Sequence, residues 1–220
     1  AVSSDGVLWT VHDTPFTAVG NAYGYAMTSP DGVNWSLSEI DSSAPELFYD
    51  VTWSSELGLF VAVGRTQVAV SSDGVLWTVH DTPFTAAWTS VAWSPELGLF
   101  VAVNEGKGDK YMTSTNGSYW IPRTFNGFAD SRSLDFYGKV VWVSELSLFA
   151  AVKRNLSSSI IVSSDGLNWR EVWNNKDTEL TTDPSLELYR TLTWSPDLSL
   201  FVSVGNHYNF ENAGFVVISK

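Results

Sequence analysis

The chain has 220 residues, of which 14% are aromatic and only 16% are charged, so a disordered or fibrous protein is excluded. Twenty-four acidic residues against 12 basic ones give a formal net charge of −12. Nucleic acids and anionic membrane surfaces are bound mainly through Lys and Arg, so we expect no nucleic-acid partner. No apolar run approaches the ~20 residues of a membrane-spanning helix, so we expect no membrane insertion. The lack of cysteine excludes disulfides and thiolate metal sites.

A seven-residue motif recurs five times, beginning with Ser-Ser-Asp-Gly-Val-Leu-Trp at residues 3–9. Its third position holds Asp5, Asp31, Asp73, Asn116 and Asp165, and its last position holds Trp9, Trp35, Trp77, Trp120 and Trp169. We expect the carboxylate to accept backbone N–H groups across a turn, the glycine to supply a positive φ, and the indole to pack beneath. Because one copy has asparagine, the position needs an acceptor rather than a charge. This pattern favours a structural role over a catalytic or calcium-binding one.

A second motif begins with Trp-Ser-Ser-Glu-Leu-Gly-Leu-Phe-Val-Ala-Val, and its copies cover residues 53–63, 93–103, 142–152 and 194–204. The two motifs together place nine of the 11 tryptophans. Such regular placement indicates that the indoles are buried repeatedly in one kind of environment.

Each repeated unit is predicted to contain four short strands, because β-branched and aromatic residues alternate between turn-forming residues. In the best-defined unit these strands are residues 51–54, 59–63, 67–71 and 77–80. No segment shows the 3.6-residue apolar period of a helix. Units of about 40–50 residues with four strands are typical of the blades of a β-propeller. Two stacked sheets, the alternative, would not require the same tryptophan in every unit.

We therefore predict an all-β, five-bladed β-propeller of four-stranded antiparallel blades, forming one domain over residues 1–220. The approximate repeats are 16–40, 48–82, 88–126, 137–174, and 189–220 together with 1–13. Residues 191–219 contain three strands and stop where the first motif should follow, whereas the chain starts with that motif and a fourth strand. We expect this N-terminal strand to complete the C-terminal blade, because closure removes an unpaired edge.

The first blade is shorter than the others. Residues 1–18 repeat residues 69–86 letter for letter, but about one strand hairpin is then missing before the next motif. Phe16–Val19 would have to serve as the second strand of a blade that lacks its innermost strand. A second copy of the chain could fill this gap, so self-association through the incomplete blade is one hypothesis.

Binding is expected on the face formed by the loops that join fourth to first and second to third strands, because these loops vary in length. An aromatic residue also stands five positions before each tryptophan of the second motif: Phe48, Trp88, Tyr137 and Tyr189. Such rings either stack on sugars or wedge adjacent blades apart, and their constant spacing favours the wedge. The predicted ligand-binding residues are Trp88, from that repeated position, and five aromatic residues in the loops: Tyr23, Trp173, His207, Tyr208 and Phe210.

The residues indicate no catalytic constellation, metal site or cofactor, because nucleophile elbows, phosphate-binding glycine loops and histidine metal spacings are lacking. Loop acids that converge in space could still act as a glycosidase pair, although solvated surface charges are the commoner explanation. The loop acids are Glu105, Asp109, Asp177, Glu179 and Glu211.

The first motif resembles the Asp box of BNR-like propellers, although here it is one residue tighter. Sialidases share this box, and their activity depends on an arginine triad, a tyrosine paired with a glutamate, and an acidic aspartate. The six arginines of this chain fall at different repeat positions. The resemblance to sialidases is thus confined to the box.

A longer resemblance covers most of the chain. The second motif at residues 93–103 and the sequence Thr-Ser-Pro-Asp-Gly-Val-Asn-Trp at residues 28–35 look like repeat propellers predicted in large marine viruses and phages. This resemblance implies a tail, fibre or virion-surface adhesion role, and an extracellular or virion-associated location.

The sequence thus favours a non-enzymatic binding or adhesion propeller that recognises a glycan or protein surface through loops on one face. A carbohydrate-acting, sialidase-like hydrolase is the first alternative. A structural or engineered scaffold without a ligand is the second.

Overall fold

The computed structural model describes residues 16–19, 24–40, 47–105, 110–125, 136–154, 159–174, 187–207 and 214–219. Apart from one turn of 3₁₀ helix at Ser144–Leu146, the regular structure in these ranges consists of strands. The predicted all-β class is confirmed, and each sheet is antiparallel.

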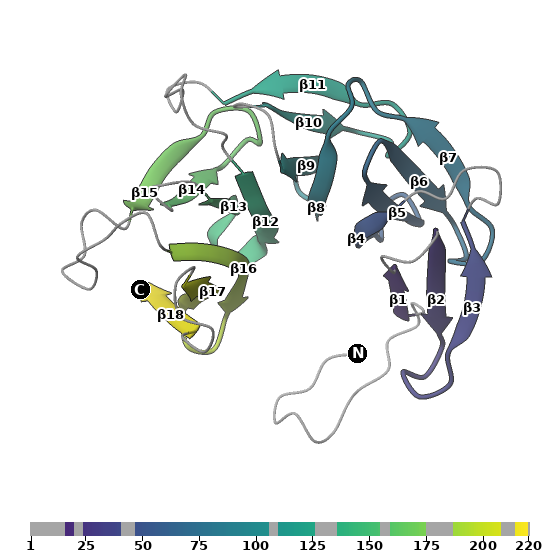
Figure 1. Cartoon of the computed structure of the whole chain (residues 1–220), viewed down its shortest axis with the longest axis horizontal. Helices are drawn as coiled ribbons and strands as arrows, with labels where there is room; N and C mark the ends of the chain where they lie inside the picture. The colour runs from purple at the N-terminus through teal and green to yellow at the C-terminus, as the bar shows by residue number, and fades with distance from the viewer. Residues whose placement is uncertain are drawn as a thin grey trace.

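The strands form groups that stand side by side in an arc (Figure 1). The first group contains β1 (Phe16–Val19), β2 (Tyr25–Ser29) and β3 (Ser36–Glu39), and the second contains β4 (Phe48–Ser54), β5 (Leu59–Gly64), β6 (Gln67–Ser71) and β7 (Thr78–Asp81). The third contains β8 (Ala87–Ser94), β9 (Leu99–Glu105), β10 (Lys110–Ser114) and β11 (Ile121–Thr124), and the fourth contains β12 (Phe136–Val143), β13 (Leu148–Arg154), β14 (Ser159–Ser163) and β15 (Arg170–Asn174). The last contains β16 (Glu187–Ser195), β17 (Leu200–His207) and β18 (Gly214–Ser219). A single pairing, between Phe136 and Glu105, joins the third and fourth groups into one eight-stranded sheet.

The predicted strands of the second group are close to those observed, but β4 begins three residues early, at Phe48. The extra length follows from a β-bulge between Phe48 and Asp50, and β8 has the same bulge between Trp88 and Ser90. A bulge re-aims the side chains that follow it. Each first strand can therefore continue past the irregularity toward the centre of the arc.

The first group has three strands among the described residues, and β1 pairs with β2 from Phe16 opposite Ser29 to Val19 opposite Ala26. This pairing agrees with the predicted second-strand role of Phe16–Val19. The groups β1–β3 and β16–β18 lie at the two ends of the arc (Figure 1). The predicted closing strand, residues 1–13, lies outside the described residues, so ring closure and the count of five blades stay predictions.

The hydrophobic core lies between neighbouring groups. Val61 and Val63 of β5 pack with Trp88, Phe100 and Trp120 of the third group, and none of these five residues is more than 3% exposed. Within a group, the tryptophan of the first strand packs on the phenylalanine of the second, as Trp93 does on Phe100 with ring centroids 4.3 Å apart. The repeated aromatic pair thus fills the same space in successive groups.

Candidate functional site

The turns of the first motif have the hydrogen bonds that the sequence predicts. In the turn after β6, Asp73 Oδ1 accepts the backbone N–H groups of Val75 and Leu76, each at 2.8 Å. In the turn after β10, Asn116 Oδ1 accepts the equivalent N–H groups at 3.0 and 2.9 Å. The amide therefore replaces the carboxylate without loss of either backbone bond, which supports the structural role. Asp5 and Trp9 lie outside the described residues.

These hydrogen bonds act on the acidity of the turn aspartates. The N–H groups of Asn34 and Val33 hold the pKa of Asp31 well below its usual range. Burial raises the pKa of Asp165, but hydrogen bonds from Asn168 and Leu167 outweigh it and lower the value to about 2. Both carboxylates are ionised at neutral pH and are held as acceptors, so they are poorly suited to donate a proton in catalysis.

The tryptophans of the first motif differ in burial along the arc. The exposed fraction is 3% for Trp120, 9% for Trp169 and 43% for Trp35. Trp169 packs edge-on against Tyr111 and Phe125 of the preceding group, with centroids 5.9 and 5.3 Å away. Trp35 belongs to the first group of the arc. The expectation of equal burial in every unit is thus met by Trp120 and Trp169 but not by Trp35.

Among the predicted ligand-binding aromatics, the structure describes the side chain of Trp88. Trp88 is completely buried and packs beside Phe84, with ring centroids 5.0 Å apart, so its ring has no surface for a ligand. Phe48, at the same repeat position, is 1% exposed. The wedge interpretation therefore fits both residues, and Trp88 is withdrawn as a binding residue.

The other candidates are not described at the level of side chains. Trp173 lies on β15 and His207 on β17, where only the backbone is described, while Tyr23, Tyr208 and Phe210 lie outside the described residues. Of the loop acids, Glu105 is exposed at the end of β9. The other four, Asp109, Asp177, Glu179 and Glu211, also lie outside the described residues.

An ionic cluster ties three groups together near the centre of the arc. Lys139 Nζ on β12 donates to both carboxylate oxygens of Asp50 on β4, at 2.9 and 2.8 Å. The hydroxyl of Ser90 on β8 and the N–H of Val91 donate to the same carboxylate, at 2.7 and 3.0 Å. Sequence reasoning missed this cluster, although its three charged or polar residues share one repeat position, three before the tryptophan of the second motif.

An open cavity of about 430 Å³ lies beside this cluster, along the first strands β4, β8 and β12. Trp53, Trp93 and Trp142 contribute to its lining. The indole N–H of Trp93 donates to Glu56 at 2.7 Å, and this bond lowers the pKa of Glu56. The indole nitrogens of Trp53 and Trp142 are buried without a hydrogen-bond partner. Because a tryptophan stands at this position in each copy of the second motif, the placement of these residues is explained by packing of the repeat.

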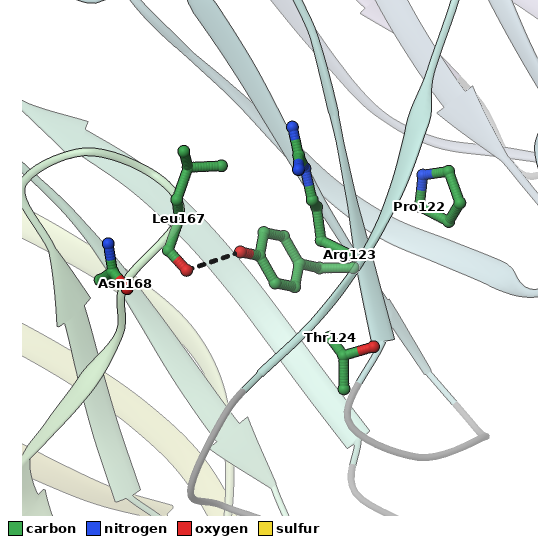
Figure 2. Close-up of a pocket in the computed structure, with 6 residues that line it drawn as sticks. Pro122, Arg123, Thr124, Leu167 and Asn168 are labelled. Carbon is green, nitrogen blue, oxygen red and sulfur yellow. Dashed lines mark hydrogen bonds between the residues drawn. The ribbon is translucent and has the colours of Figure 1, made fainter.

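A second cavity, of about 410 Å³, lies at the outer rim between the third and fourth groups. Figure 2 shows Pro122, Arg123 and Thr124 along β11, facing Leu167 and Asn168 in the turn before β15. We call this feature the rim cavity; Tyr111 of β10 completes its lining.

Hydrogen bonds hold the rim cavity in shape. The hydroxyl of Tyr111 donates to the Leu167 carbonyl at 3.1 Å, the bond dashed in Figure 2. Burial raises the pKa of Tyr111, so the hydroxyl keeps its proton and remains a donor. Arg123 Nε donates to Thr113 Oγ1 at 3.1 Å, which fixes the inner end of the guanidinium. The described lining residues of the cavity thus include one cation together with hydroxyl and amide groups.

The sequence did not reveal the rim cavity, because its residues come from strands and a turn far apart in the chain. Arg123 and Tyr111 form a cross-strand pair, with Tyr111 opposite Arg123. At the same register the second group has Val68 opposite His80, and the first has Ala26 opposite Ser38. The only available signal was this departure from the repeat at a pair of facing positions.

The described residues offer neither a metal site nor a membrane-spanning helix. In those ranges there is no cluster of three or more His, Cys, Asp and Glu side chains that could hold a metal ion. The helical part of the same ranges contains nothing long and apolar enough to cross a membrane.

Comparisons with known proteins identify the fold alone. No family model matches the chain, and no curated protein matches it either. An ancestral GH74 enzyme is similar in structure, with a TM-score of 0.67 and 14% identity over 96% of this chain, which spans 28% of that protein. A chain of a nidogen/laminin complex matches with a TM-score of 0.62 and 10% sequence identity, and the match covers 91% of this chain and 77% of that one. A streptogramin B lyase matches with a TM-score of 0.58 and 11% sequence identity, and the match covers 94% of this chain and 72% of that one. These are β-propeller proteins, and the likeness shows that this chain has a propeller fold.

Proposed function

We propose that this propeller is a non-enzymatic binding or adhesion protein that recognises a glycan. The observation that carries the proposal is the rim cavity, whose polar groups are arranged for recognition. Its lining combines a guanidinium, a hydroxyl and an amide with the apolar surfaces of Pro122 and Leu167. Ligand sites are typically concave, with a few placed polar groups on apolar walls, and volumes of roughly 300–1,000 Å³.

The chemistry of this cavity favours binding over hydrolysis. Glycosidases need two carboxylic acids across the scissile bond, about 5–9.5 Å apart. The six lining residues that the structure describes include no acid. Asp165, in the adjoining turn, accepts N–H groups of its own loop and has a lowered pKa, which makes it unsuitable as a general acid.

The proteins of similar structure favour neither binding nor hydrolysis, because they include both a glycoside hydrolase and a binding complex. At 10–14% identity they inform about fold alone. The choice therefore rests on the chemistry of the cavity. A protein surface remains the second class of partner, favoured by the exposed side chain of Tyr119 beside the rim, at 73% exposure.

The finer predictions from sequence belong to the same proposal. They are a ring of five blades, a C-terminal blade completed by the N-terminal strand, kinship with Asp-box repeat propellers of viruses and phages, and a virion-surface or extracellular location. They also include the lack of a cofactor and of a nucleic-acid partner. Four hydrogen-bonded motif turns in the described residues support the Asp-box kinship.

A glycan array probed at several protein concentrations tests this function, together with incubation on fluorogenic glycosides. Binding without turnover is the expected result. Turnover that falls in the variant Glu105→Gln would instead establish the hydrolase. No binding to any glycan would reject the proposal and leave the protein-partner or scaffold interpretations.

A further inference from the structure

We propose that Arg123 binds the carboxylate of an acidic sugar in the rim cavity. This inference rests on the proposed glycan-binding function and names its ligand class and its site. A guanidinium and a carboxylate are both planar, so they can form two parallel charge-assisted hydrogen bonds.

Arg123 has no acidic partner among the residues that the structure describes. Its Nε donates to the Thr113 hydroxyl, and a guanidinium has four further N–H donors at its two terminal nitrogens. An ion pair joins Lys139 and Asp50, and Arg123 takes no part in it. Acidic residues outnumber basic ones two to one in this protein, with 24 against 12.

Asp165 lies in the turn that contributes Leu167 and Asn168 to the cavity, but its carboxylate forms no ion pair with Arg123. Its Oδ1 accepts the N–H groups of Leu167 and Asn168 and the hydroxyl of Ser163, at 2.7–2.9 Å. Its Oδ2 accepts the Asn168 side-chain amide at 2.7 Å. The carboxylate is thus fully engaged by its own turn. The terminal N–H donors of Arg123 are therefore not occupied by this carboxylate and can meet an anion from solution.

The surroundings of the guanidinium suit a sugar that carries a single charge. Tyr111 is 1% exposed, stacks on Phe125 with centroids 4.2 Å apart, and bonds to Leu167, so this wall is rigid. Thr124 and Pro122 flank Arg123 on β11 and are among the described lining residues (Figure 2). One cation among neutral polar groups matches one carboxylate on a polyhydroxylated ring. An acidic peptide or a phosphate-rich ligand would call for several cations.

Tyr111 belongs to the buried core, but neither its hydroxyl nor the Arg123 guanidinium recurs at the equivalent positions of the first and second groups. The equivalent cross-strand pairs are Val68 with His80 and Ala26 with Ser38, and those strands form without the tyrosine or the arginine. Structural residues of this propeller recur at their repeat positions, as the motif tryptophans do. Tyr111 and Arg123 do not recur, which is the pattern expected of a site on one sector of a repeated scaffold.

Isothermal titration with galacturonic acid and its methyl ester tests the inference, because the ester keeps the sugar ring and removes its single charge. We expect the wild type to bind the acid at least tenfold more tightly than the ester, which corresponds to about 1.4 kcal/mol of charge-assisted hydrogen bonding. Because salt screens charges, this preference should fall as the salt concentration rises. Arg123→Gln should abolish this preference, and Arg123→Lys should retain part of it. Arg170→Gln is the matched control, because it removes the same charge from exposed β15 outside the cavity lining.

Equal affinities for the acid and the ester, or an unchanged preference in Arg123→Gln, would overturn the site. A wild type that binds sodium acetate as tightly as galacturonic acid would also overturn it, because the cavity walls would then contribute nothing. In these cases the glycan array can still show binding, so the array tests the proposed function and the titration tests the Arg123 site. A thermal unfolding midpoint equal to that of the wild type shows that each variant is folded.

Discussion

Asp73 and Asn116 occupy the same place in two turns and accept the same pair of backbone N–H groups. The turn therefore depends on the position of one oxygen atom. Asp73 also accepts a hydrogen bond from Ser71 at 3.0 Å, and Asn116 keeps a similar bond from Ser114 at 3.2 Å. What the residue must provide is an acceptor short enough to reach back across the turn.

This geometry predicts different outcomes for two substitutions of Asp73. Asp73→Ala removes the acceptor of two N–H groups and should lower the melting temperature by about 2–4 °C, the shift that about 1 kcal/mol gives at this size. Asp73→Asn should lower it by less than half as much. Calorimetry on the two variants measures the difference. Equal losses would mean that the charge, and not the acceptor, holds the turn.

The lowered pKa of Asp165 predicts a loss of stability in acid. The pKa of the native carboxyl is about 2, whereas the ordinary aspartate value is 3.8, so ionisation stabilises the fold above pH 4. This contribution should disappear as the pH falls from about 4 to about 2. Urea unfolding at a series of pH values measures it. Asp165→Asn, which introduces the residue that position 116 already has, should show a shallower pH dependence over that window, and an identical slope would contradict this account.

At the scale of elements, each motif turn packs against the group that precedes it in the arc. A Cβ on Gly117 would lie 2.8 Å from Val61 Cγ2, and one on Gly166 would lie 2.7 Å from Leu99 Cδ2. Both glycines have positive φ, of 76° and 71°. The glycine thus serves two purposes, because it allows the turn and allows the neighbouring sheet to approach.

Two glycine substitutions separate these purposes. Gly98→Ala meets no atom within 4 Å, and Ser147 and Ser199 adopt similar φ values of 50° and 51° at the same turn position. It should cost about 1 kcal/mol from backbone strain alone. Gly117→Ala has the same strain and also clashes with Val61, so it should cost about 1–3 kcal/mol more. Chemical denaturation gives both values, and equal costs would show that the sheets can move apart freely.

At the scale of the whole molecule, position along the arc determines how far a repeated side chain is buried. The motif tryptophans are chemically identical, but Trp169 is 9% exposed and Trp35 is 43% exposed. Trp169 has a preceding group to pack against, including Tyr111 and Phe125. The stability that each repeat contributes therefore depends on its neighbour.

This dependence predicts unequal losses from the same substitution. Trp169→Ala should cost about 3–5 kcal/mol, because it empties a buried site between two groups. Trp35→Ala should cost less than half as much. Equilibrium unfolding in urea gives the two free energies. A cost for Trp35→Ala equal to that for Trp169→Ala would indicate that the first group is covered as fully as the others.

The sequence predicted most of the strands correctly, because their signals are local. Gln67–Ser71 is bounded as predicted, since a turn motif follows it directly. Phe48 was missed as the start of β4, because a bulge leaves no periodic signal in one sequence. The candidate site was predicted less well than the strands. Trp88, predicted to bind a ligand, lies in the core, and Arg123 was not singled out for binding. An aromatic residue that fills a gap between sheets and one that meets a ligand have the same local pattern.

The amino-acid sequence by itself determined the repeat, the hydrogen-bonded turns and the all-β class, because each depends on residues within a few positions of one another. Only the tertiary structure decided which departures from the repeat meet in space. Tyr111 reaches the carbonyl of Leu167, 56 positions along the chain, and Asp50 meets Lys139 at a separation of 89. Such meetings depend on how neighbouring sheets stack, and stacking is fixed by the buried aromatic and valine side chains between them rather than by the residues that meet.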